Sequence, residues 1–424
     1  MVVKVIEEVA KIEEVVNKLI NDRREVISFI NVTPWWGGNE FGYTFDDDGN
    51  VTYPTANGIV GKTRWFMRNI IAQALSRDNF SEVDERYLKE LGTLNNKSKI
   101  TVRVIKERGD VEPHYFTKEE AACAFKRSLK LDKSICHNKD TLCNLGSLSP
   151  IDEYLMYFCV PRFNLVHLGQ NGPEFYYYNQ PARPRSIRIK VEVINNGASK
   201  EFFEFFKMSL IFTMKYMGIG RAATRGFGRF VPENQSGQSS LDEELGKLYS
   251  LLKPIIKNDE VRPLNLEKIS RPCLFNYRND NFLPIYGQNP IVYLIAIGNA
   301  TLKVAWKRFE GKPYKDHGYN YHTWTLGLPR GQGRLGYSIK KEEDREKEDK
   351  GRRISYITLS PKCDGYTCEE IYLIPFIYEE EEAKKLIHRG KHDREKEVVK
   401  GNVRSYVEKA LKQIKLMLSG GSDA

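Results

Sequence analysis

Glycines and arginines alternate in one segment of the chain, GIGRAATRGFGR at 218–229. Glycine lets a backbone adopt positive φ and approach a ligand closely, and a guanidinium group donates to phosphate oxygens in a fork. Exposed backbone N–H groups in such a loop can bind the same anion. This glycine-rich loop therefore predicts contact with a phosphate-bearing ligand, and a plain glycine turn with solvated arginines is the alternative. Its glycines are Gly218, Gly220, Gly226 and Gly228, and its arginines are Arg221, Arg225 and Arg229.

Positive charge is concentrated around this loop. Residues 181–230 contain ten Lys or Arg and three Glu, which gives +7 out of the +10 of all 424 residues. An excess of this kind favours a polyanionic partner. A second basic group, Lys62, Arg64 and Arg68, lies on a helix predicted over 61–75, where Trp65, Phe66, Ile70, Ile71 and Leu75 form an apolar stripe.

Aromatic residues near these cations narrow the class of polyanion. Aromatic rings stack on any nucleobase, and positively charged grooves with such rings bind single strands. Trp36 and Trp65 are the candidates closest to the basic groups, together with Trp35 and the run Tyr176–Tyr178. The pattern favours single-stranded nucleic acid, although each ring taken alone is more typical of a core.

Residues 56–63, ANGIVGKT, formally match a phosphate-binding loop that ends in Gly61, Lys62 and Thr63. Such a loop needs a buried strand directly before it, but Pro54 interrupts the preceding segment. The sequence therefore disfavours nucleotide hydrolysis. A helix N-terminus that could bind a backbone phosphate remains. The acidic run DDDGN at 46–50 is interpreted as a hairpin turn and not as a metal site.

Residues for acid–base or metal chemistry are scattered. His114 or His167 could serve a metal-independent ribonuclease as general base. Cys136, His137 and Cys143 could bind zinc, but their spacing departs from that of structural zinc sites, and free thiols are the preferred interpretation. Cys363 and Cys368 are likewise interpreted as free thiols.

The compartment and the broad class follow from composition. Seven Cys without regular spacing indicate reduced thiols and a cytoplasmic protein. The chain has no run of about 18 apolar residues, which excludes a membrane-spanning protein, and its charged first residues exclude a signal peptide. Hydrophobic residues make up 41% and charged residues 29%, as in globular domains.

The elements that position these residues can be outlined from periodicity. Apolar residues at steps of three and four predict a helix over 2–20, VISFINV at 26–32 predicts a strand, and RIKVEV at 188–193 predicts another. A helix over about 203–217 and a strand after the glycine-rich loop complete a strand, helix, strand, helix, strand order over 26–232, interrupted by an insertion at about 80–180. This order favours a ferredoxin-like domain.

A second domain is predicted after the linker NQSGQSS at 234–240. IVYLIAI at 291–297 is interpreted as its first strand, 340–353 as a solvated charged loop, and about 396–418 as a final helix. The predicted division is an N-terminal helix (1–25), a first domain with the insertion (26–239) and a second domain with the C-terminal helix (240–424).

The ordered motifs TPWWGG, GIVGKTRWFMRN and GIGRAATRGFGRF resemble the repeat-associated mysterious protein (RAMP) superfamily of CRISPR systems. LGLPRGQGR at 326–334 and GRRISYITLSP at 351–361 are similar to the second half of one family within it, the first-numbered subunit of the Cmr complex, a type III-B RNA-guided effector. Trp35-Trp36 and SYITLSP depart from that family's pattern.

The resemblance implies an α+β fold of two ferredoxin-like (RRM-like) domains packed together, with the large insertion and extra helices at both termini. It implies a non-catalytic subunit of an antiviral complex that holds the 3′ region of guide RNA or its target, with the other subunits of the complex as partners and without a cofactor or metal. Lys62, Arg64, Trp65 and Arg68 would lie beside a central groove that Arg221, Arg225 and Arg229 line, with Trp36 in the neighbouring loop. A repeat-processing endoribonuclease and a purely architectural subunit remain the alternatives.

Overall fold

The computed structural model describes most of the chain but not all of it. The described residues are 23–37, 43–46, 48, 50–76, 80–93, 96–107, 166–169, 172–175, 181–233, 240–258, 261–276, 281–301, 306, 309–310, 323–326, 336–339, 355–376, 386–389, 395–397 and 401–421. The helix predicted over 2–20, the linker residues 234–239 and the charged segment 340–353 lie outside this part.

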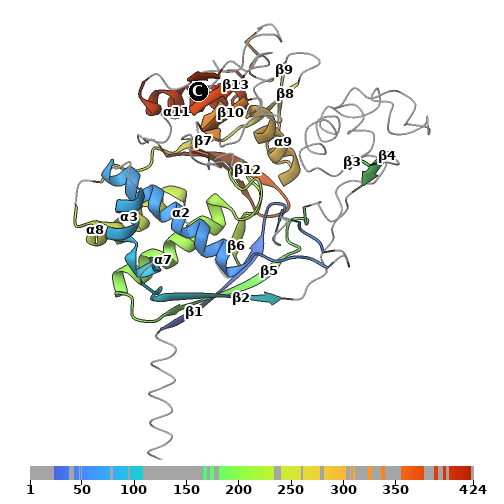
Figure 1. Ribbon diagram of the computed structural model, residues 1–424. Coiled ribbons are helices and arrows are strands. Elements are labelled where there is room, and N and C mark those ends of the chain that lie inside the picture. Colours follow the sequence, from blue (N-terminus) through green and yellow to red (C-terminus); the bar gives the residue numbers. More distant parts are fainter. Residues whose placement is uncertain are drawn as a thin grey trace, which may run out of the picture.

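The first half is built on a four-stranded antiparallel sheet in the order β2-β5-β1-β6 (Figure 1). All three strands predicted here are present as β1, β5 and β6, and β1 and β5 are each slightly longer than expected. The inner face of β5 carries Ile189, Val191 and Val193, all fully buried, which explains the alternating pattern. The strands are β1 (Arg24–Asn31), β2 (Ile100–Glu107), β5 (Arg188–Asn195) and β6 (Phe230–Pro232).

Helices cover one face of this sheet. The two long ones are α2 (Ala56–Leu75) and α7 (Lys200–Phe212), whose Phe66 and Phe212 rings stack with 4.8 Å between centroids. α2 begins five residues earlier than predicted because the Thr55 side chain caps it by accepting from the Gly58 N–H. A short helix, α3 (Phe80–Tyr87), packs on α2, and a π-helical turn, Thr213–Met217, extends α7.

The second half begins with α8 (Leu241–Ile256), which packs on α7, and contains several small antiparallel sheets. In Figure 1 the sheet β11-β12-β7 lies between the helices of the first half and the remaining elements. Its strands are β7 (Glu267–Ile269), β11 (Ile357–Cys363) and β12 (Cys368–Pro375). The others are β8 (Cys273–Asn276), β9 (Asn281–Pro284), α9 (Pro290–Ala300), a 3-10 turn at Thr323–Leu326, β10 (Gly336–Ile339), β13 (Leu386–Arg389), β14 (Glu395–Glu397) and α11 (Val403–Leu418).

The strand predicted at 291–297 is wrong, because this segment is the helix α9. Val292, Tyr293, Leu294, Ile295 and Ala296 are all buried, so the helix is apolar on every side and shows no helical period. Its start is marked by Asn289, whose side chain accepts from the Val292 N–H at 3.2 Å, and by Pro290 in the first turn.

The last predicted helix is shorter than expected. It begins at Val403, after the Asn402 cap, and the strand β14 (Glu395–Glu397) occupies the place of its first residues. The insertion predicted over about 80–180 is wrong at its start, because α3 (Phe80–Tyr87) packs on α2 and β2 (Ile100–Glu107) is a strand of the main sheet. Beyond β2, the described residues before 181 form two short strands, β3 (Val166–Gly169) and β4 (Gly172–Phe175). No helix in the described ranges is long and apolar enough to cross a membrane.

The prediction of free thiols at Cys363 and Cys368 is also wrong. The two cysteines form a disulfide that joins the ends of β11 and β12. They are register partners across this hairpin, with 4.1 Å between their Cα atoms, so the turn of four residues between them brings the sulfurs together. Cys273 is a free thiol whose pKa is raised by burial.

Candidate nucleic-acid interface

The glycine-rich loop folds back on itself between the first half and the second. All four of its glycines have positive φ, from 62° at Gly228 to 93° at Gly226. A Cβ on Gly228 would overlap the carbonyl oxygen of Ile219, and one on Gly226 would lie 2.8 Å from Pro361 of β11. The glycines are therefore required by close packing within the chain.

Backbone N–H groups of the glycine-rich loop donate hydrogen bonds to acceptors within the protein. Ile219 N donates to the Gly228 carbonyl at 2.9 Å, and Gly228 N donates to the Pro34 carbonyl at 2.8 Å. Arg221 N donates to the Trp36 carbonyl at 2.7 Å. The expectation that this backbone cradles phosphate is therefore wrong for these groups, and the loop instead fixes the positions of its arginines.

Arg221 and Trp36 are in direct contact. The Arg221 guanidinium lies over the Trp36 ring at 4.3 Å from its centroid, and the ring is tilted against Phe227. Trp36 is 4% exposed, so it does not offer a free face to a nucleobase, and burial lowers the pKa of Arg221. Trp36 thus supports an arginine that reaches the surface, a role which differs from the predicted stacking contact.

Arg229 is enclosed between the two halves and is fully buried. Its Nε donates to Ser360 Oγ at 3.1 Å and one terminal nitrogen donates to the Leu359 carbonyl at 3.0 Å. Burial lowers its pKa to about 9. The prediction that Arg229 lines a groove is therefore wrong, because its guanidinium holds the loop against β11. Arg225 stays partly exposed, and its backbone forms a parallel bridge to Leu359.

The basic residues of α2 divide into two groups. Arg64 and Arg68 both pair with Asp84 of α3, and Arg64 also donates to the Gly92 carbonyl at 2.8 Å. These two arginines therefore join α2 to α3. This structural role explains their presence on α2 without any contact to RNA.

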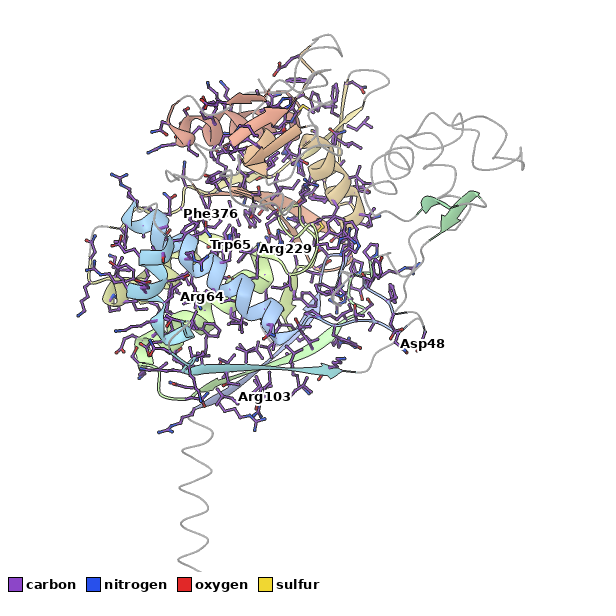
Figure 2. The ribbon with its side chains drawn as sticks, in the orientation of Figure 1. Asp48, Arg64, Trp65, Arg103, Arg229 and Phe376 are labelled. Carbon is purple, nitrogen blue, oxygen red and sulfur yellow. A yellow bond between two sulfur atoms is a disulfide. The ribbon has the colours of Figure 1, made fainter. Side chains whose placement is uncertain are left out.

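Lys62 and Trp65 lie on the side of α2 that faces the second half. The Lys62 Nζ lies 3.8 Å from the centroid of the Trp65 ring, which contacts Phe376 edge-on at 5.5 Å. Figure 2 shows Trp65, Phe376 and Arg229 where the two halves meet, with Arg64 lower on α2. Burial and the nearby Arg229 charge lower the pKa of Lys62 to about 7. Trp65 is thus an interface residue between the halves.

The remaining chemical motifs give no catalytic site within the described residues. Residues 56–63 form the first turns of α2 and not a phosphate-binding loop. The acidic run is a turn, as predicted: Asp46 Oδ1 accepts from Asn50 N at 2.7 Å, and Phe45 pairs with Val51. No group of three metal-ligating side chains is present in the described part of the chain. Cys136, His137, Cys143 and His114 lie outside the described residues, as does the side chain of His167.

Sequence reasoning passed over Arg183 and Arg185 as individual residues. Both are exposed, and their segment is tied to the same strand end as the loop: Ala182 and Trp35 exchange two backbone hydrogen bonds, of 3.0 and 2.8 Å. Arg221 is bonded to the next residue, Trp36. The dense charge of 181–230 was the available signal, but only the tertiary structure shows which of its cations belong together.

These features define an α+β protein whose antiparallel sheet carries an arginine-bearing glycine-rich loop, packed against a second half. The family model of the RAMP superfamily matches residues 29–231. This stretch begins near the end of β1 and ends in β6, so it covers β2, β5, the helices α2 and α7, and the glycine-rich loop. This match confirms the resemblance to the RAMP superfamily that was found in the motifs.

Solved structures of Cmr proteins are similar to the chain at low identity. One is a chain of the cryo-EM structure of the Type III-B Cmr-beta bound to cognate target RNA and AMPPnP (12% identity, 93% of this chain and 99% of that chain covered, TM-score 0.49). Another is the apo crystal structure of Cmr1 from Pyrococcus furiosus (14%, 83% and 87%, 0.42). A third is a chain of Cmr-beta bound to cognate target RNA (14%, 92% and 99%, 0.43). A comparison with curated proteins gave no sequence match.

Proposed function

We propose that this protein is a non-catalytic RNA-binding subunit of a type III-B (Cmr) CRISPR effector complex. It holds single-stranded guide or target RNA, near the 3′ region of the guide, while base pairing supplies sequence recognition. In this proposal the chain comprises two ferredoxin-like domains, 26–239 and 240–424, after an N-terminal helix that ends before β1 begins at Arg24. The other subunits of the effector are its protein partners, and it works in the cytoplasm without a cofactor.

One observation carries the proposal. Within a RAMP domain, two backbone segments that bear arginines are hydrogen-bonded to the same Trp35–Trp36 segment. One carries the exposed Arg183 and Arg185, and the other carries Arg221 on the glycine-rich loop. Arginines on backbone segments that meet at one point of the chain suit a row of backbone phosphates.

Lys62 adds a cation whose charge depends on its surroundings. With a pKa lowered to about 7, it is partly neutral at physiological pH, and a phosphate placed beside it would favour the charged form. Lys62 is therefore kept in the proposed RNA site, together with Arg221 and Arg225. Arg64, Trp65, Arg68, Arg229 and Trp36 are assigned to the scaffold that positions this site.

The salt dependence of RNA binding tests the proposed site. For a single strand, removing one cation that binds a phosphate lowers the slope of log K against log salt by roughly 0.7. The double variant Arg221→Ala/Arg225→Ala should therefore lower the slope by about 1.4, equally for unrelated sequences. The double variant Arg271→Ala/Arg404→Ala removes the same charge outside the site and should leave the slope unchanged. An unaltered slope in the first variant would remove the loop from the site.

RNA that copurifies with the tagged chain tests the assignment to an effector. Short RNAs with CRISPR repeat sequence are expected after isolation from the native host at moderate salt. Recovery of no RNA would favour the architectural alternative. Metal-independent cleavage of repeat RNA by the isolated chain, abolished on replacement of His114 or His167, would favour the endoribonuclease.

A further inference from the structure

The hairpin between β11 and β12 presents an exposed aromatic ring at its turn. Tyr366 is 69% exposed, the highest value among the large hydrophobic side chains of the described residues. A single exposed ring is common on protein surfaces and does not identify a partner by itself. What distinguishes Tyr366 is the way its turn is held and the residues beside it.

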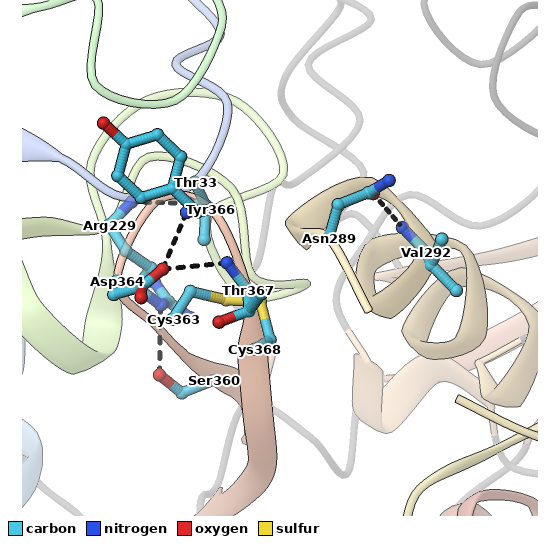
Figure 3. The surroundings of a disulfide bond; sticks show 10 residues. All are labelled: Thr33, Arg229, Asn289, Val292, Ser360, Cys363, Asp364, Tyr366, Thr367 and Cys368. Carbon is cyan, nitrogen blue, oxygen red and sulfur yellow. Dashed lines mark hydrogen bonds between the residues drawn. A yellow bond between two sulfur atoms is a disulfide. The ribbon is translucent and has the colours of Figure 1, made fainter. Parts of the chain in front are cut away.

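Three interactions hold the turn in one conformation. Asp364 Oδ1 accepts from Tyr366 N at 2.7 Å and from Thr367 N at 2.8 Å, and Asp364 N donates to the Thr367 carbonyl at 3.1 Å. The Cys363–Cys368 disulfide closes the turn directly behind these bonds. Figure 3 shows the Tyr366 ring projecting from this closed turn. The ring is thus carried by a backbone with little freedom.

Arg185 from the first half completes the arrangement. It donates to the Asp364 carbonyl at 3.0 Å, its guanidinium lies 5.0 Å from the centre of the Tyr366 ring, and its aliphatic chain packs on Gly365. Arg185 has φ of 60°, and its N–H donates to the Asn31 carbonyl at 2.6 Å. A non-glycine residue with positive φ is costly and is concentrated at functional sites. The cation–ring pair therefore joins the two halves at a strained, fixed point.

The surroundings of the ring indicate the chemistry of its partner. Arg185 lies beside the ring, and Arg183, two residues earlier in the same segment, is also exposed. The stretch 181–230 to which both belong carries +7, from ten Lys or Arg and three Glu. The Asp364 carboxylate is engaged by the backbone of its own turn. A ring next to exposed guanidinium groups suits a polyanion that also carries aromatic groups, which describes single-stranded nucleic acid.

We propose that Tyr366 is a stacking platform for one nucleobase of bound single-stranded RNA, while Arg185 holds the ring and contacts the adjacent phosphate. The proposal rests on the RNA-binding function above and adds a site in the second half of the chain. The ring is already ordered, so binding a base on it sacrifices little side-chain entropy. Stacking is tolerant of base identity, in keeping with a subunit that does not read sequence.

Two oligonucleotides with equal numbers of phosphates test this platform, oligouridine and its abasic analogue, each with a fluorescent end label. The complete chain should bind oligouridine more tightly. Tyr366→Ala should weaken oligouridine binding by about 5- to 150-fold, the range found for removal of one stacking ring, and leave the abasic analogue unaffected. Tyr366→Phe should bind as the wild type does.

Tyr286→Ala is the matched control, because Tyr286 is a similarly exposed tyrosine, at 62%, on the loop before α9. It should change neither affinity. Wild-type affinity of Tyr366→Ala for oligouridine would overturn the platform while leaving the RNA-binding function intact. Failure of the wild type to bind either oligonucleotide would overturn both. Equal weakening for both oligonucleotides would show that Tyr366 acts through the fold or the phosphates and not through a base.

Discussion

The Arg229 guanidinium donates to the main-chain carbonyl of Leu359 at 3.0 Å, across 130 positions of sequence. This bond and the one to Ser360 Oγ join the glycine-rich loop to β11 inside the molecule. Leu359 N also donates to the Thr224 carbonyl, so the loop and the strand are bonded in both directions. The loop that carries Arg221 and Arg225 is therefore positioned by the second half of the chain.

Removal of the Arg229 side chain should destabilise the protein. Arg229→Ala leaves a cavity and two polar groups without their donor, and we expect the free energy of unfolding to fall by about 2–4 kcal/mol. Arg229→Met should lose less, because it removes the same buried charge but fills most of the cavity that alanine leaves. Urea unfolding of both variants, with the exposed Arg271→Ala as control, measures the difference. Equal stability of wild type and Arg229→Ala would show that the bonds from Arg229 to Leu359 and Ser360 do not stabilise the fold.

Lys62 should make stability depend on pH. Its folded pKa of about 7 lies below its ordinary value of 10.5, so between these values the unfolded state binds more protons. Stability should therefore rise with pH across that window, by at most about 1.4 kcal/mol per pH unit from this group. Lys62→Met should flatten that part of the profile, measured by urea unfolding at pH 6 to 10. Parallel profiles for the two proteins would show that Lys62 titrates normally.

The disulfide should stabilise the β11–β12 hairpin by a modest amount. In the chain-entropy account, closing a loop of six residues contributes roughly 2 kcal/mol. The double variant Cys363→Ser/Cys368→Ser should therefore unfold at lower urea concentration and should no longer respond to dithiothreitol, whereas the wild type should be weakened by it. An equal response of both proteins to the reductant would show that dithiothreitol does not act through the Cys363–Cys368 disulfide.

Gly228 and Gly61 form a contrasting pair. A Cβ at Gly228 meets the Ile219 carbonyl at a φ of 62°, whereas nothing lies within 4 Å of a Cβ at Gly61 in α2. Gly228→Ala should lower the unfolding free energy by more than about 1 kcal/mol, as positive φ alone makes alanine unfavourable. Gly61→Ala should raise it by about 0.5–1 kcal/mol, because alanine favours helix. Thermal unfolding of the two variants decides whether the loop needs its glycine.

Asp84 should be important for the fold and not for RNA. It pairs with both Arg64 and Arg68, whose side chains are about one quarter exposed. Asp84→Ala should lower the unfolding free energy by about 1–2 kcal/mol, since two partly buried guanidinium groups lose their carboxylate. RNA affinity should stay within a factor of about two if these arginines belong to the scaffold. A large change in affinity would return Arg64 and Arg68 to the RNA site.

Three of the four strands of the first sheet followed from the sequence: β5 from its alternating side chains, β1 from a run of β-branched and apolar residues, and β6 from its place after the glycine-rich loop. The fourth, β2 (Ile100–Glu107), was missed because it lies in the segment interpreted as an insertion. The order of elements in β1, α2, β5, α7 and β6 and the turn at 46–50 were predictable from such local patterns. The strand prediction for 291–297 was wrong because a helix that is buried on all sides has no apolar period. The cap at Asn289 and Pro290 was a signal that could have corrected it.

The sequence by itself determined the RAMP domain, its antiparallel sheet and the concentration of charge in 181–230, since these depend on local periodicity, motif order and composition. Which arginine reaches the surface depended on tertiary packing: Arg221 and Arg229 occur in the same loop, but β11 covers only the second. The same packing placed Arg185 beside Tyr366. The Cys363–Cys368 disulfide, in contrast, depends on the pairing of β11 and β12 across a short turn. Contacts between residues more than a hundred positions apart leave no periodic trace in the sequence, so only the folded chain fixes them.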